Sequence, residues 1–200
     1  MKPLAWIATV GLCALTTSAT TGRAAEPTAP AAWGHPADGL RLSVALVPAL
    51  DPAQKDADIE VGFENVGTED KTLNLGMLLA NGHLQEPDAV RLDVTDAKGK
   101  SMTFDLCEIG AIAGRVDDYV VPLRHGSTFC FRVSSRHYLS LQSMGTIAEL
   151  PAGHYTLTAH FEGKGAQLAH QNGDLAGIAL MNFWKGGLDS NAVSFEVGKG

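Results

Sequence analysis

Apolar residues recur at every second position along most of the chain from residue 40 onward. This period of two places the apolar side chains on one face of a β-strand. Turn residues such as those at 65–67 and 96–100 separate the runs. The pattern therefore predicts an all-β domain of about seven to nine antiparallel strands, either a β-sandwich or a closed barrel. The runs lie near residues 40–46, 59–63, 73–79, 90–94, 102–106, 119–123, 129–133, 155–161 and 193–197.

Three connections are longer than the turns of a sandwich require, at residues 108–118, 135–149 and 163–191. Residues 140–150 in the second connection fit a helical turn. Long loops in compact domains are usually functional or disordered, and the third connection is too apolar for disorder. It either forms a binding patch for another protein or folds back over one end of the sandwich, with Trp184 as the plug. The candidate binding residues in it are Leu175, Ile178, Met181, Phe183 and Trp184.

The first residues have the layout of a secretory signal peptide, with Lys2 before an apolar run and small residues after it. We assign residues 1–25 to this peptide, 26–39 to an Ala/Pro-rich lead and 40–200 to the domain. Cleavage after Ala19 and cleavage after Ala25 are both open. The apolar run is short for a membrane span, although an uncleaved anchor is an alternative. We expect a periplasmic or secreted protein with no membrane span after cleavage.

The charge of the chain argues against two kinds of partner, nucleic acid and anionic lipid. Removing Lys2 and Arg23 with the leader lowers the 15 basic residues to 13 against 22 acidic residues, a net charge of −9. Phosphate backbones are bound by clustered Lys and Arg, and no such run is present. We therefore expect no nucleic-acid partner and no docking on anionic lipid.

Two cysteines remain in the mature part, Cys107 and Cys130. An even number of cysteines in an exported chain favours a disulfide. Each cysteine is out of phase with the apolar residues of its strand, so both could face outward on the same side. We expect a Cys107–Cys130 bridge, and two buried free thiols are the alternative. No Cys-x-x-Cys pair is present, which argues against an oxidoreductase.

The sequence contains no catalytic motif. It lacks the Gly-x-Ser-x-Gly turn of hydrolases, the zinc-binding His-Glu-x-x-His motif and the glycine-rich loops of nucleotide sites. The acidic residues Glu108, Asp117 and Asp118 flank one connection, where a solvated loop is more common than an acid pair. We therefore expect no enzyme activity and no cofactor.

Metal binding has little support in the spacing of the histidines. His154 and His160 lie on the same face of one predicted strand, but about 20 Å apart at the usual rise per residue, too far to share an ion. No close His-x-Met pair is present for copper, and Met77 and Met102 fit core positions. We expect no metal site.

Two segments resemble immunoglobulin-like domains. Leu150-Pro-Ala-Gly-His-Tyr155-Thr-Leu-Thr-Ala resembles the corner that opens strand F, where a tyrosine hydroxyl bonds back to the backbone and its ring joins the core. Tyr155 would take that role. The stretch 184–197 resembles the last strand of many bacterial domains of this class. The resemblance implies an immunoglobulin-like β-sandwich.

The segments 64–67 and 94–100 are similar to an Asn-x-Gly turn and a Val-x-Asp-x-x-Gly-Lys hairpin of BsuPI-type domains. This resemblance makes proteinase inhibition one specific expectation. Function sits in sites carried by such folds, so the fold transfers no activity. The preferred hypothesis is a non-enzymatic exported module that binds another protein or an envelope component. The alternatives are a small secreted hydrolase with a loop-built site and a periplasmic metal carrier.

Overall fold

The computed structural model describes residues 32–50, 56–78, 89–106, 117–165 and 181–198. Their regular elements are all β-strands apart from one 3-10 helix, and turns and loops join the strands. More strands are present than the seven to nine expected, because short strands at the sheet edges leave no period-two signal. The elements are β1 (Ala32–Trp33), β2 (Leu40–Pro48), β3 (Ala57–Asn65), β4 (Lys71–Leu78), β5 (Val90–Asp96), β6 (Ser101–Leu106), β7 (Asp117–Leu123), β8 (Thr128–Ser134), β9 (Tyr138–Ser140), β10 (Gly145–Thr146), η1 (Ile147–Glu149), β11 (Gly153–Gly163), β12 (Gly186–Asp189) and β13 (Val193–Val197).

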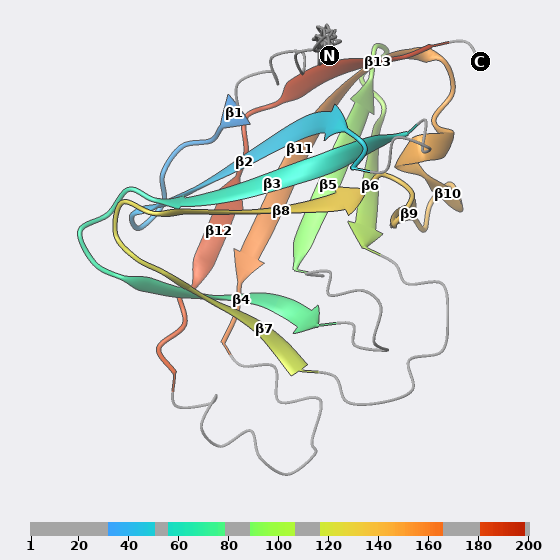
Figure 1. Cartoon of the computed structure of the whole chain (residues 1–200). Helices are drawn as coiled ribbons and strands as arrows, with labels where there is room; N and C mark the ends of the chain where they lie inside the picture. The colour runs from blue at the N-terminus through green and yellow to red at the C-terminus, as the bar shows by residue number, and fades with distance from the viewer. Residues whose placement is uncertain (1–31, 51–55, 79–88, 107–116, 166–180, 199–200) are drawn as a thin grey trace, which may run out of the picture.

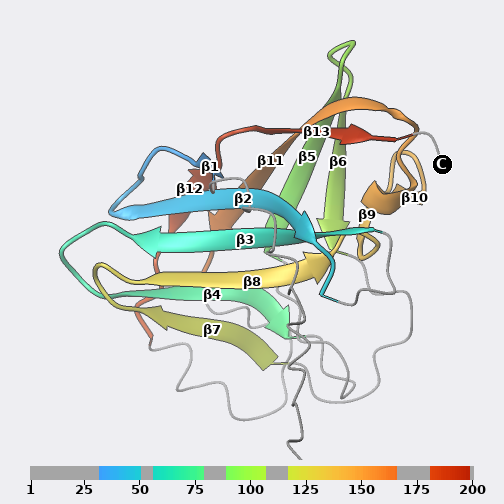
Figure 2. The ribbon, with the colours of Figure 1, turned by 45° about the horizontal axis from the view of Figure 1, so that its top comes forward.

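The strands form two antiparallel layers, which confirms the predicted sandwich. One sheet has the order β1-β2-β3-β8, and the other has the order β10-β9-β6-β5-β11-β12, with β13 also paired to β11. The order β2-β3-β8 facing β6-β5-β11-β13 is that of strands A-B-E and C′-C-F-G in an immunoglobulin-like sandwich. In Figure 1 the first sheet crosses in front of the second, and Figure 2 shows the same crossing after rotation.

The core lies between these layers and follows the period-two pattern of the sequence. The rings of Phe63 on β3 and Phe161 on β11 meet edge to face, with their centroids 4.9 Å apart. This contact links the central strands of the two sheets, and edge-to-face geometry is favourable for aromatic pairs. The other fully buried apolar side chains include Leu40, Leu42, Val44, Ile59, Val61, Leu92, Val94, Leu157 and Ala159.

A third pair of strands, β4 and β7, continues the antiparallel β3–β8 ladder beyond a bend. Asn65, which is fully buried, occupies this bend. Its side-chain Nδ2 donates hydrogen bonds to the backbone carbonyls of Glu69 (2.8 Å) and Leu123 (3.0 Å). Its Oδ1 accepts a hydrogen bond from the backbone N–H of Gly67 (3.1 Å). One amide therefore satisfies three backbone groups where the ladder is interrupted.

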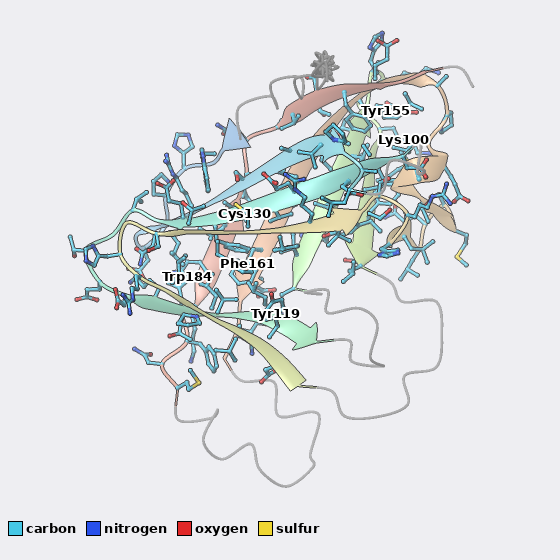
Figure 3. The ribbon with its side chains drawn as sticks, in the orientation of Figure 1. Lys100, Tyr119, Cys130, Tyr155, Phe161 and Trp184 are labelled. Atoms are coloured by element: carbon cyan, nitrogen blue, oxygen red, sulfur yellow. The ribbon has the colours of Figure 1, made fainter. Side chains whose placement is uncertain are left out.

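Tyr155 makes the hydrogen bond that the sequence resemblance led us to expect. Its hydroxyl donates to the backbone carbonyl of Pro151 at 2.8 Å, and its ring is buried and stacks on Phe195. The bond spans four residues and fixes the entry of the chain into β11. Figure 3 marks Tyr155 at one end of the sandwich and Phe161 and Trp184 toward the other.

Candidate functional site

The predicted binding residues of the third connection fall into three groups. Phe183 and Trp184 are buried, with 4% and 5% of their surface exposed, whereas Met181 is 40% exposed. Leu175 and Ile178 lie outside the described residues. In this structure Phe183 and Trp184 therefore have little surface to offer a partner.

Trp184 closes one end of the sandwich. Its ring stacks on Phe161, with the centroids 6.0 Å apart and the planes at 18°. It also lies over Gly163 and Gly186, which are paired between β11 and β12. A Cβ on Gly163 would lie 2.5 Å from Cε3 of Trp184, and one on Gly186 would lie 2.9 Å from Cη2. The two glycines leave the space that the indole occupies.

The structure describes only one of the two cysteines of the predicted bridge, because Cys107 lies outside the described residues. Cys130 is an exposed residue with a free thiol, on the outer face of β8 as expected. Its sulfur packs near Gly62, where an added Cβ would lie 3.2 Å away. Burial of the sulfur raises the pKa of this thiol, and the nearby Glu60 carboxylate adds to the increase. The structure shows no disulfide among the described residues, so the Cys107–Cys130 bridge stays a prediction without structural support.

A polar cluster on the outer face of the second sheet surrounds His160. Its Nδ1 lies 2.6 Å from Oδ1 of Asp189 on β12, and its Nε2 lies 3.1 Å from Oδ2 of Asp93 on β5. His154 lies on the same face of β11, as predicted, with Nδ1 3.9 Å from Glu196. His160 borders an open hollow of about 440 Å³ that Arg91 and Glu162 also line.

This cluster ties three strands together but does not form a metal centre. Both ring nitrogens of His160 already face carboxylates, so neither is left to coordinate an ion. Within the described ranges, no group of three or more His, Cys, Asp or Glu side chains is placed to hold a metal. Of the acidic residues Glu108, Asp117 and Asp118, which flank the connection at 108–118, the structure describes the side chain of Asp118 alone.

Among the residues that the structure describes, two of the three most exposed large apolar side chains lie at the turn between β9 and β10. Leu141 and Met144 have 72% and 75% of their surface exposed. They flank the tip of a short hairpin in which Ser140 pairs with Gly145 and Leu139 with Thr146. We call Leu141 and Met144 the apolar tip. Single exposed apolar residues are common, but two on one turn form a concentrated apolar projection.

The backbone beneath the apolar tip is held in place. The N–H of Met144 donates to the carbonyl of Ser140 at 2.8 Å, and Met144 adopts φ of +54°. This left-handed conformation costs on the order of 1 kcal/mol or more for a residue other than glycine, and such residues cluster at functional sites. The turn is therefore a defined conformation that carries local strain.

The start of η1 braces the other side of the hairpin. Thr146 is the N-cap residue of this helix. The backbone N–H and the hydroxyl of Thr146 donate hydrogen bonds to the Glu149 carboxylate, at 2.9 Å and 3.1 Å. The backbone N–H of Thr146 lowers the pKa of Glu149, and the hydroxyl contributes further. Below the tip, Tyr138 and Ile147 are buried in the core. The expected helical turn within residues 140–150 is thus confirmed as this 3-10 turn.

A further exposed apolar side chain lies at the same end of the sandwich. Leu50, 72% exposed, follows β2, and its N–H donates to the buried Asp58 carboxylate at 2.9 Å. The end of β2 lies opposite the start of β3, since Pro48 pairs with Ala57. The N–H of Ser135, in the chain leading to β9, bonds to the carbonyl of Ala57. Both views place β9 and β10 beside this end of the first sheet (Figures 1 and 2).

The comparisons with known proteins leave the function to be argued from the geometry. No family model matches the chain, and a search of curated proteins finds no match. No helix among the described residues is long and apolar enough to cross a membrane.

Proposed function

We propose that this chain is an exported, non-enzymatic binding module that docks on another protein of its compartment through the apolar tip. The observation that carries the proposal is the exposure of Leu141 and Met144 on a braced turn. Exposed apolar side chains on a fixed backbone lose little conformational freedom on binding, so most of their burial contributes to affinity. The signal-peptide layout of residues 1–25 supports export.

The size of the expected contribution follows from burial. Transferring a Leu or Met side chain from water into a protein interface is worth about 1.5–3 kcal/mol. Losing both side chains of the apolar tip should therefore weaken binding about a hundredfold or more. A partner must offer an apolar pocket wide enough for a two-residue projection. A proteinase cleft is one such pocket, which connects this proposal with the BsuPI-type resemblance.

The test begins with a photo-crosslinking residue at position 141 in the tagged mature protein, residues 26–200. The matched control carries the same residue at the exposed Lys98 on the β5–β6 turn. Any protein that crosslinks at 141 and not at 98 is purified, and its Kd is measured against wild type, L141S/M144S and V66S. Val66 is 43% exposed and follows the opposite end of β3.

We expect L141S/M144S to keep the melting temperature of wild type and to lose about a hundredfold in affinity, while V66S binds normally. Equal affinity of the double variant and wild type would show that the tip is not the docking element. A crosslinked protein that the V66S variant alone fails to bind would place the interface at the other end of the sandwich.

A further inference from the structure

The described methionines differ sharply in how far they reach solvent. Met144 is 75% exposed and Met181 40% exposed, whereas Met102 is partly buried and packs against the core. Oxidation of a thioether requires an oxidant to reach the sulfur. The exposure therefore ranks Met144 first among these three for oxidation.

We propose that Met144 is an oxidation site that switches off docking of the apolar tip, an inference that rests on the proposed function. A peroxide transfers one oxygen atom to the Met144 sulfur and its O–O bond breaks. With hydrogen peroxide, the sulfur gives up two electrons, a sulfoxide forms and water leaves. The product is a polar side chain in place of an apolar one.

The hairpin can accept this change without unfolding. The hydrogen bonds that hold the turn involve the Met144 N–H, the Ser140 carbonyl, Thr146 and Glu149, and none involves the Met144 sulfur. Leu141 remains as the second apolar side chain. Oxidation therefore alters the chemistry of the tip while its backbone stays in place, as a switch requires.

The docking consequence follows from desolvation. A sulfoxide oxygen that enters an apolar pocket without a hydrogen-bond donor loses its hydrogen bonds to water and gains none in return. We expect oxidised protein to bind the partner about tenfold or more weakly. The variant Met144→Leu keeps the apolar volume and cannot form a sulfoxide, so it should bind in the presence of oxidant as well as in its absence.

The experiment has two readouts, and the first needs no partner. Mature protein is treated with hydrogen peroxide, each methionine is followed by peptide mapping, and retention on a phenyl resin is measured. We expect Met144 to oxidise first and retention to fall with it. M144L should keep its retention, and M181L should behave as wild type. Oxidation of Met102 before Met144, or equal loss of retention in M144L, would overturn the proposal.

The second readout is the Kd of the crosslinked partner for oxidised wild type and oxidised M144L. Loss of affinity in wild type alone supports the switch. Unchanged affinity after complete Met144 oxidation refutes the switch and leaves tip docking intact. If L141S/M144S already binds as wild type does, the proposed function itself fails and the switch fails with it.

Discussion

The side-chain amide of Asn65 donates a 3.0 Å hydrogen bond to the backbone carbonyl of Leu123, 58 residues further along the chain. The bond joins the end of β3 to the end of β7, where the β3–β8 ladder gives way to β4–β7. The backbone of Asn65 contributes as well, since its N–H donates to the carbonyl of Ser127 and its carbonyl accepts from the N–H of Gly126. A buried amide with partners on all sides fixes the bend.

Removing the donor at this bend should destabilise the domain. Asn65→Asp keeps the shape but turns an acceptor toward two carbonyls, which leaves the buried Leu123 carbonyl and the partly buried Glu69 carbonyl without this donor. Each such loss costs about 1–3 kcal/mol, so we expect a large fall in the free energy of unfolding, measured by urea denaturation. Asn182→Asp, at an exposed asparagine, is the control. Wild-type stability in N65D would contradict the role given to this amide.

The glycine pair beneath Trp184 gives a second prediction. A Cβ at Gly163 would lie 2.5 Å from the indole and 2.8 Å from the Trp184 carbonyl, whereas one at Gly187 would meet nothing within 4 Å. We expect Gly163→Ala to destabilise the domain by about 1–3 kcal/mol through overpacking, and Gly187→Ala to be tolerated. Thermal melting followed by tryptophan fluorescence compares the stabilities of the two variants. Similar melting curves for the two variants would mean that Trp184 does not close this end.

The Glu149 carboxylate makes the order of the hairpin depend on pH. Its pKa is lowered because the ionised form accepts hydrogen bonds from the Thr146 N–H and hydroxyl. A lowered pKa in the folded state means that the stabilisation is present above the ordinary glutamate value of about 4.3. It is lost as the pH falls through the lower folded value. An NMR titration should show the Thr146 amide moving with Glu149, and Glu149→Ala should abolish the effect. A Glu149 pKa at or above the ordinary glutamate value would contradict the stabilising role of these hydrogen bonds.

Cys130 should react slowly with alkylating agents at neutral pH. Burial of its sulfur and the Glu60 carboxylate raise the pKa of the thiol, so less of the reactive thiolate is present. Alkylation should accelerate as the pH rises. Glu60→Gln should also accelerate it, because the substitution removes the negative charge and frees Arg132, whose Nε lies 2.6 Å from Glu60. Alkylation that occurs only after reduction would instead show that Cys130 is held in a disulfide, as the predicted Cys107–Cys130 bridge requires.

The sequence indicated the sandwich because burial alternates along its strands. In β11 the inward residues Tyr155, Leu157, Ala159 and Phe161 are all buried, as the apolar pattern required. The hydrogen bond of Tyr155 could be expected because its partner, Pro151, lies only four positions earlier in the chain. Features that depend on residues close together in the sequence could therefore be predicted from the sequence.

Features that depend on residues far apart in the sequence could not be predicted from the sequence. The pattern of residues 73–79 indicated a strand but could not show that β4 would leave the sheet and pair with β7. Likewise, Asp93 and Asp189 meet His160 only through the register of β5, β11 and β12. Leu141 and Met144 lay in a connection marked as long, but an apolar residue in a loop gives no sign of whether it turns inward. Exposure is decided by the whole fold.

Strand β4 holds both borders of the stretch at 166–180. The Nδ2 of Asn74 donates to the carbonyl of Gly165 at 3.2 Å, and the carbonyl of Thr72 accepts from the N–H of Trp184 at 2.8 Å. One strand thus fastens the chain just before and shortly after this stretch. A change that displaces β4 would therefore release Gly165 and Trp184 together, and the end of the sandwich that Trp184 closes would open with them.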